Sequence, residues 1–188
     1  WRVTQRCKFA ATNRALRIAL QTDNHSASLS RATDISIWDT SEIEQHPFLQ
    51  RLGPDLLAPE TQADTVLALL EQATFKNRQL ASLYLDQGFI AGNGNSLRSE
   101  IFFFAGVNPL LKPRELTQPA RKKLAKNTIS ISQRSYRTGG ITLPASITPK
   151  DTKPGRRYYE RDRFAVFARE GKPCRICRTP IKKSVVTS

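Results

Sequence analysis

The sequence predicts an α+β protein in which a strand-rich first part, a helical middle and a short cysteine-containing end follow one another. Apolar and polar residues alternate through the first 38 residues, apolar residues then recur at helical spacing, and a Cys-x-x-Cys motif lies near the end. With 39% apolar and 24% charged residues, the 188-residue chain has the composition of an ordinary globular protein. Strands and helices in separate blocks are typical of an α+β arrangement.

The strand-rich part is predicted to be the end of a β domain, residues 1–44. Apolar residues alternate with polar ones over residues 16–20 and again over residues 35–37, and the polar residues 22–24 form a turn between the two runs. Two prolines and a glycine then interrupt residues 45–55, and we interpret residues 45–59 as a linker.

Helical spacing characterises the middle of the chain. Val66 and Leu70 share one face of a first predicted helix, for which Thr61 is a suitable cap. A second helix is predicted over residues 77–85, and a basic fourth helix over residues 116–126, whose lysines are expected to face solvent.

The most informative segment is the glycine-rich turn within residues 85–100, between the second helix and a third. Gly88, Gly92 and Gly94 are expected to allow positive φ angles, and Asn95 is expected to be the N-cap of the third helix. Free amide groups and the positive end of the helix dipole would then face outward and suit a phosphate. Alternatively, the glycines serve to close a tight helical hairpin. A dinucleotide-binding fingerprint is excluded because a helix, not a strand, precedes the turn.

Residues 127–155 are predicted to form a mobile functional loop. They are rich in Ser, Thr, Gly and Pro, show no helical periodicity and are too numerous for a simple connection. We group them with the helices as a middle region of residues 60–155. A short strand around Phe164 is predicted to open the last region, residues 156–188.

The net charge of +14 is concentrated at one end of the sequence. Residues 1–120 contain 12 Lys and Arg against 12 Asp and Glu, whereas residues 121–188 contain 18 against 4. Such a division favours a polyanionic partner, and nucleic acid is preferred over a membrane. No apolar run approaches the roughly 20 residues that a membrane-spanning helix requires. No leader is recognisable, so a cytoplasmic location is expected.

Three cysteines do not make a disulfide framework, but two of them have the spacing of a zinc knuckle. Cys174 and Cys177 can reach one tetrahedral ion from a single tight turn. A redox Cys-x-x-Cys is less favoured because Pro173 and a strand, rather than a helix start, surround the motif. Cys7 is interpreted as a small buried residue on a strand. A second cysteine pair is expected after Ser188.

Three ordered motifs together resemble the formamidopyrimidine-DNA glycosylase and endonuclease VIII family. They are the turn of residues 85–95 with Glu100 behind it, the segment 169–177 (Arg-Glu-Gly-Lys-Pro-Cys-Arg-Ile-Cys), and the linker segment 46–55, which favours the endonuclease VIII branch. The resemblance covers nearly the whole chain. It implies an N-terminal β-sandwich, a helix-two-turns-helix domain and a C-terminal zinc β-hairpin, with DNA held between them.

The family resemblance implies DNA base-excision repair by a bifunctional DNA glycosylase/AP lyase acting on oxidised bases, with pyrimidines expected for this branch. In such an enzyme the amine of an N-terminal proline attacks the sugar C1′, a Schiff base forms and elimination nicks the strand, while a neighbouring glutamate assists proton transfer. The implied partner is double-stranded DNA that contains oxidised bases or abasic sites. A monomer associated with the bacterial nucleoid is expected.

By the same resemblance, Gly92, Gly94 and Asn95 are predicted to contact DNA phosphate, and Cys174 and Cys177 to supply two of four zinc ligands. Asn93 departs from the family pattern, which usually has an apolar residue at that position.

Tyr136 and Arg137 are also predicted to contact DNA, because the sequence around them resembles the region that closes over an extruded base. No catalytic residue is predicted within the chain. The chain has no methionine and starts at Trp1 in a strand-like run, so we expect a fragment whose catalytic residues lie upstream. The alternative function is a non-catalytic helix-two-turns-helix module that binds nucleic acid.

Overall fold

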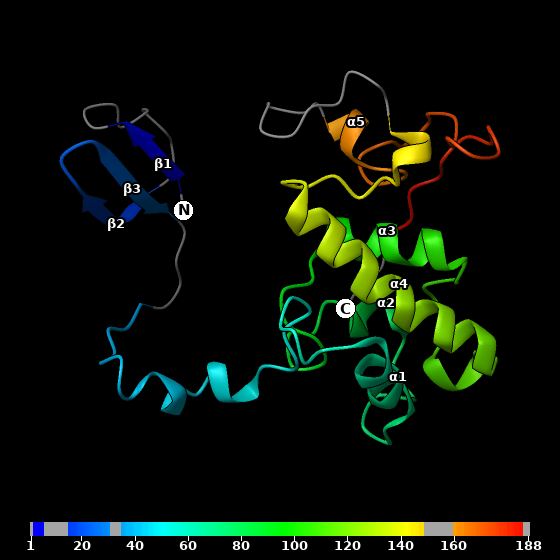
Figure 1. Cartoon of the computed structure of the whole chain (residues 1–188), viewed down its shortest axis with the longest axis horizontal. Coiled ribbons are helices and arrows are strands. Elements are labelled where there is room, and N and C mark those ends of the chain that lie inside the picture. The colour runs from blue at the N-terminus through cyan, green and yellow to red at the C-terminus, as the bar shows by residue number, and fades with distance from the viewer. Residues whose placement is uncertain (1, 6–14, 31–34, 149–159, 186–188) are drawn as a thin grey trace. The chain divides into compact units, whose positions relative to one another are not determined.

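The computed structural model describes residues 2–5, 15–30, 35–148 and 160–185, which form two compact units (Figure 1). The first unit ends at His46 and the second starts at Pro47, within the predicted linker. The prediction for Cys7 and the end of the predicted loop, residues 149–155, fall outside the described residues.

The first unit contains a three-stranded antiparallel sheet in the order β1-β3-β2. Its strands are β1 (Arg2–Gln5), β2 (Leu16–Gln21) and β3 (His25–Ser30). The predicted strand and turn at residues 16–24 are confirmed, and the amide of Thr22 donates to the carbonyl of His25 over 2.9 Å.

The second predicted run of this unit, residues 35–37, is wrong, because these residues form no strand. β3 takes the place beside β2 instead, with Ala19 opposite Ser28. The small polar residues of β3 hide its strand character, which depends on pairing with both neighbours. A short 3-10 helix, η1 (Ile43–Gln45), ends the unit.

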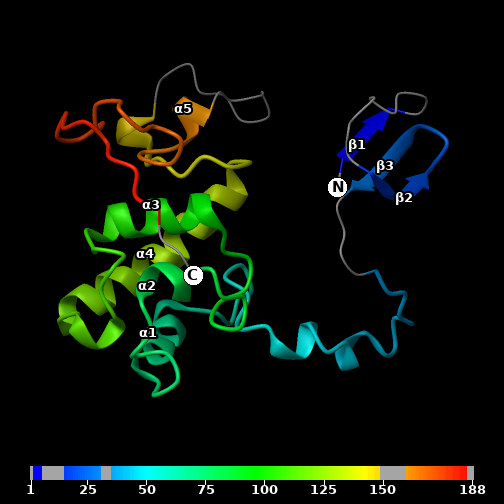
Figure 2. The same cartoon turned by 180° about the vertical axis from the view of Figure 1, so that it is seen from behind.

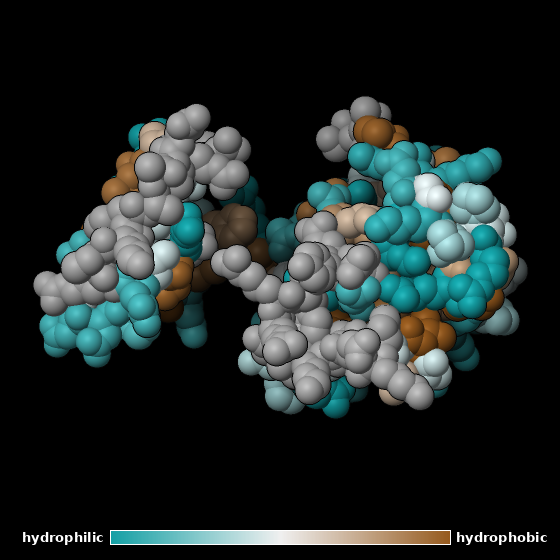
Figure 3. Space-filling model, turned by 90° about the horizontal axis from the view of Figure 1, so that it is seen from above, coloured by the Kyte–Doolittle hydropathy of each residue, from teal (hydrophilic) through white to brown (hydrophobic). Residues whose placement is uncertain are grey.

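Helices build the second unit, in which the core lies between α1, α2, α3 and α4. Their bounds are α1 (Ala63–Glu71), α2 (Leu80–Leu83), α3 (Asn95–Ala105) and α4 (Gln118–Arg137). Both α1 and α3 pack against α4, and α3 and α4 lie side by side in both views (Figures 1 and 2). Hydrophilic side chains predominate on the coloured part of this unit in Figure 3, as expected when the apolar residues are inside.

Tyr84, at the end of α2, lies in the centre of this core and is fully buried. Its ring lies 4.8 Å from the ring of Phe102 and 5.5 Å from that of Phe89, measured between centroids. The phenol oxygen is 2.9 Å from the hydroxyl of Thr128, and burial raises the pKa of Tyr84. One polar pair is therefore satisfied inside an otherwise apolar core.

Three local predictions for this unit need correction. The N-cap of α1 is Gln62, one residue after the predicted Thr61, which is itself buried. α4 continues to Arg137, so residues 127–137 are helical and do not belong to a loop. No strand forms around Phe164, because the short helix α5 (Glu160–Arg163) is followed by turns.

Part of the predicted linker belongs to the second unit. After the 3-10 helix η2 (Leu49–Arg51), Gly53 donates its amide to the carbonyl of Gln87 over 2.8 Å, and Ala91 donates to the carbonyl of Pro54 over 3.0 Å. A side chain on Gly53 would meet the carbonyl oxygen of Phe89 at 2.5 Å. This close approach fixes the linker against the glycine-rich turn.

Short irregular elements complete the second unit. They are the 3-10 helices η3 (Pro113–Glu115) and η4 (Ala145–Ile147), and a tight hairpin at residues 171–181. In the hairpin, Gly171 donates to the carbonyl of Ile181 and Ile181 donates to that of Lys172, each over 2.9 Å. Within the described parts of the chain, no helix is long and apolar enough to cross a bilayer.

Candidate nucleic-acid interface

The turn that precedes α3 is held by side chains of its own residues. Gln87 accepts a hydrogen bond from the amide of Gly92 at 3.0 Å and donates to the carbonyl of Asn93 at 2.9 Å. Of the three glycines predicted to allow positive φ, Gly92 has a φ of 84°, whereas Gly88 and Gly94 do not adopt such angles. The backbone angle therefore requires glycine at only one of these three positions, that of Gly92.

Asn93 is a polar residue in the interior of the turn. It is 3% exposed, and its Nδ2 donates to the carbonyl of Tyr84 over 2.7 Å. Its Oδ1 has no partner among the described residues. The amide therefore satisfies a carbonyl at the end of α2 and couples the turn to that helix.

Asp86 fixes the start of the same turn. One carboxylate oxygen accepts from Arg78 at 2.6 Å and the other from the amide of Gly88 at 2.8 Å. The hydrogen bond with Arg78 is the main reason that the pKa of Asp86 lies below its usual value. Asp86 stays ionised at neutral pH and so holds both donors.

The first turn of α3 presents its amide groups without a side-chain cap. Gly94, not Asn95, is the N-cap, and Asn95 is the first helical residue. The predicted cap is therefore wrong by one position, since Asn95 Oδ1 accepts instead from Arg98 at 2.9 Å. The amides of a first helical turn have no partner within the helix, and the dipole makes this end positive.

Arg98 lies directly beside these amides. It donates to the carbonyl of Ala81 as well as to Asn95, so α2 and α3 are joined at this point. Burial lowers the pKa of Arg98 from its very high usual value, but a guanidinium remains charged at neutral pH. Sequence reasoning missed this residue, although its position three residues after Asn95 places it on the same face of the helix.

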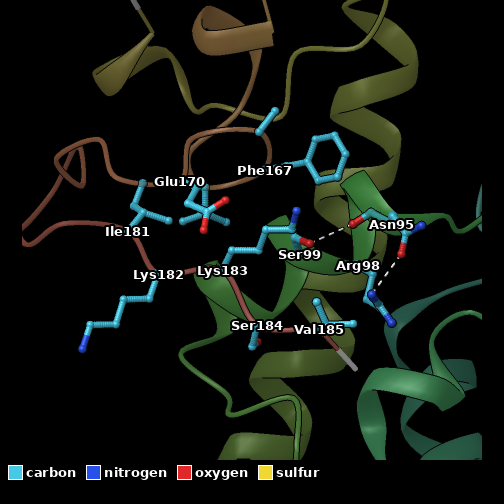
Figure 4. Close-up of a pocket in the computed structure, with 12 residues that line it drawn as sticks. Asn95, Arg98, Ser99, Phe167, Glu170, Ile181, Lys182, Lys183, Ser184 and Val185 are labelled. Carbon is cyan, nitrogen blue, oxygen red and sulfur yellow. Dashed lines mark hydrogen bonds between the residues drawn. The ribbon is translucent and has the colours of Figure 1, made fainter. Parts of the chain in front are cut away.

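A groove of about 740 Å³ separates the start of α3 from the hairpin region (Figure 4). Asn95, Arg98 and Ser99 line one wall, and residues 166–168, Glu170 and 181–185 line the other. Lys183 points into the groove toward α3, whereas Lys182 points away from it (Figure 4). Of the residues predicted to bind DNA or zinc, Asn95 lines this concave surface, whereas Gly92, Gly94, Cys174 and Cys177 do not. The surface also contains a lysine that the sequence analysis did not single out.

Tyr136 and Arg137 lie apart from this groove, at the end of α4. Tyr136 is 73% exposed, and Arg137 hydrogen bonds to the carbonyl and side chain of Gln133. Neither residue lines the groove. Their contact with DNA stays a prediction.

Cys174 and Cys177 occupy the tip of the hairpin at residues 171–181. The amide of Ile176 points at Cys174 Sγ over 3.4 Å, and the amide of Cys174 donates to the carbonyl of Thr179 over 2.8 Å. Hydrogen bonding with Thr179 lowers the pKa of the exposed Cys177 thiol. The described residues contain no group of three or more His, Cys, Asp or Glu arranged for a metal.

With fold and groove established, sequence comparison gives the class of the protein. Residues 52–146 match the H2TH domain of formamidopyrimidine-DNA glycosylase. Endonuclease 8 of Klebsiella pneumoniae is 38% identical over 188 residues, and Endonuclease 8 of Escherichia coli K12 is 36% identical; in both cases the match covers this whole chain and 68% of the relative.

Solved structures agree with this class. The MutM (Fpg) protein of Thermus thermophilus has a TM-score of 0.68 at 26% identity, and the match covers 95% of this chain and 66% of that chain. Lactococcus lactis Fpg in complex with DNA that contains an abasic site has the same TM-score at 17% identity, covering 98% of this chain and 66% of that chain, which supports the fold alone.

The chain belongs to the formamidopyrimidine-DNA glycosylase and endonuclease VIII family. Within that family it is endonuclease VIII-like, since its full length matches Endonuclease 8 proteins. None of these similarities favours the alternative of a non-catalytic module. The chain spans about two thirds of the length of the relatives and structures that it matches.

Proposed function

We propose that this chain is the DNA-holding part of a bifunctional DNA glycosylase/AP lyase of base-excision repair, and that the groove beside α3 binds the DNA backbone. The proposed substrate is double-stranded DNA with oxidised bases, pyrimidines above all, or with abasic sites. DNA of a bacterial nucleoid is the corresponding cellular partner. The family membership supports the reaction, and the groove supports the role of this chain within it.

The observation that carries the proposal is that the uncapped start of α3 and a lysine of the opposite wall lie at the same groove. Asn95, at the start of α3, and the charged side chain of Lys183 line one groove, and no side chain caps the first-turn amides of α3 beside it. Amides at a helix N-terminus bind phosphate by direct hydrogen bonds and through the dipole, and a lysine adds a point charge. Contacts of this kind orient a duplex without reading its bases.

In the proposed mechanism these residues hold the strand while chemistry occurs at the lesion. A glycosylase/AP lyase displaces the damaged base with an amine nucleophile, forms a Schiff base and breaks the strand by elimination. We assign none of these steps to a residue of this chain. Fixing the phosphate backbone lowers the entropic cost of bringing the sugar to the nucleophile.

We further propose that Cys174 and Cys177 hold a structural zinc ion. Their hairpin directs both sulfurs from one tight turn, and an amide donor at Cys174 Sγ is suited to a thiolate. The described residues place no further ligand beside them, so the proposal requires two more from elsewhere in the protein. The ion would stabilise the wall of the groove that carries Lys183.

Replacing Asn95 with alanine tests the groove directly. We expect Asn95→Ala to weaken binding of the 188-residue chain to an abasic-site duplex threefold to tenfold, about 1 kcal/mol for one lost neutral hydrogen bond. The loss should be equal for undamaged duplexes of different sequence, because phosphate contacts carry no sequence information. Fluorescence anisotropy with labelled duplexes measures both quantities.

Asn77→Ala is the matched control, since Asn77 is exposed and does not line the groove. It should bind all duplexes as the unmodified chain does. A change in lesion preference with unchanged affinity in Asn95→Ala would contradict the assignment of Asn95 to the backbone.

A further inference from the structure

The buried carboxylate of Glu100 connects α3 to the opposite wall of the groove. Glu100 is 0% exposed and follows Asn95 by five positions along α3. Its Oε2 accepts from the amide of Ala165 and from the hydroxyl of Thr142, each at 2.7 Å. Its Oε1 accepts from the amides of Val166 and Phe167 at 2.8 and 2.9 Å.

Three consecutive amides around one anion form the arrangement that proteins use to bind phosphate. Successive backbone amides in a turn converge on a concave, positively polarised site. A carboxylate fills it well, because its two oxygens can accept several hydrogen bonds at once and its charge strengthens each of them. A buried charge is expensive without such partners, so Glu100 and this turn depend on each other.

Arg169 links a carbonyl of the same turn to a carbonyl of the hairpin. It is 6% exposed, and it donates to the carbonyl of Ala165 at 2.7 Å and to that of Pro173 at 3.0 Å. Pro173 directly precedes Cys174. A continuous set of hydrogen bonds therefore runs from α3 through the turn to the hairpin.

We propose that Glu100 is a positioning residue that fixes the distance between the two walls of the DNA-binding groove. Residues 166–168, held by its carboxylate, line the wall that faces Asn95. The hairpin wall, including Lys183, is attached to α3 through this contact. The role of Glu100 in DNA binding rests on the proposed function. The hydrogen bonds between Glu100 and residues 165–167 do not depend on that function.

Glu100→Gln tests the contact, because it keeps the size of the side chain and removes its charge and one acceptor oxygen. We expect amide hydrogen exchange at residues 165–167 to accelerate at least about tenfold, since hydrogen bonds to a charged group are lost. Exchange in α1 and in the core part of α4 should stay within twofold. Glu60→Gln, at an exposed position outside the groove, is the control. It should change neither the exchange at residues 165–167 nor the exchange in α1 and α4.

Thr142→Val is a second variant in case Glu100→Gln does not fold. It removes one of the four donors and leaves the charge, so the acceleration at residues 165–167 should be smaller, about threefold. Unchanged exchange at residues 165–167 in both folded variants would overturn the proposal.

Salt dependence of DNA binding separates positioning from simple loss of folded protein. Each phosphate contact contributes about −0.9 to the slope of log K against log salt concentration. A displaced hairpin wall should make the slope of Glu100→Gln shallower by about one contact, whereas a lower folded fraction alone leaves it unchanged. An unchanged slope with faster exchange would overturn the role in the groove, and absence of DNA binding by the unmodified chain would instead contradict the proposed function.

Discussion

Gly92 and Gly94 have different tasks in the turn before α3, although their sequence setting is similar. Gly92 has a φ of 84°, which a side chain rarely allows, whereas Gly94 is extended and no atom lies within 4 Å of the place of its absent Cβ. The sequence alone assigns both the same role, because a backbone angle depends on how the turn closes and not on the residue type.

Alanine substitutions distinguish these roles. We expect Gly92→Ala to lower the free energy of unfolding by about 1–2 kcal/mol, the cost of placing a Cβ in the left-handed region. Gly94→Ala should change it by less than about 0.5 kcal/mol, because a slightly poorer cap is offset by a less flexible unfolded chain. Urea unfolding followed by circular dichroism at 222 nm reports on the second unit, which contains the described α-helices. Equal costs at both positions would contradict the conformational explanation.

At the scale of elements, α4 illustrates what periodicity can and cannot predict. The prediction ended this helix at residue 126 because residues 127–155 are rich in Ser, Thr, Gly and Pro and show no helical periodicity. The helix continues because Thr128 and Ser132 lie on its buried face together with Leu124 and Ile131. Thr128 is accommodated there by Tyr84, a tertiary contact across 44 positions that no local pattern contains.

In the C-terminal region, too, contacts between distant residues decide a structure that local sequence patterns do not predict. The Cys-x-x-Cys spacing was sufficient to predict a tight turn that carries both sulfurs, and the hairpin at residues 171–181 contains it. The strand predicted around Phe164 is absent, because the amides that follow it bond to Glu100, 65 or more positions earlier. A helical carboxylate that binds a distant turn leaves no signal in a single sequence.

The hairpin should bind a metal through both cysteines if the zinc proposal holds. Addition of Co²⁺ to the reduced chain should produce thiolate-to-metal charge-transfer absorbance, which Cys174→Ser and Cys177→Ser each weaken strongly, because the thiolates are the ligands. Cys7→Ser is the control and should retain the full charge-transfer absorbance. Full absorbance in Cys177→Ser would remove that residue from the ligand set.

At the scale of the whole molecule, basic residues alone do not identify the DNA-binding face. The last 68 residues contain 18 Lys and Arg, and many of them lie outside the groove, including Lys122 and Lys126 on α4. What distinguishes the groove is that Asn95, at the start of α3, and Lys183 line one concave surface, whereas Lys122 and Lys126 lie on an exposed helix face. The sequence motifs predicted Asn95 and the two cysteines as site residues, but they could not predict which lysine would line the groove with Asn95.

The most direct test of this account is lysine footprinting of the 188-residue chain with and without an abasic-site duplex. Acetylation at limiting reagent, read by mass spectrometry, compares Lys183 with Lys126 in the same sample. If DNA lies in the groove beside α3, the duplex should reduce acetylation of Lys183 severalfold and leave that of Lys126 nearly unchanged. Protection of Lys126 with full reactivity of Lys183 would place DNA on α4 and contradict the account.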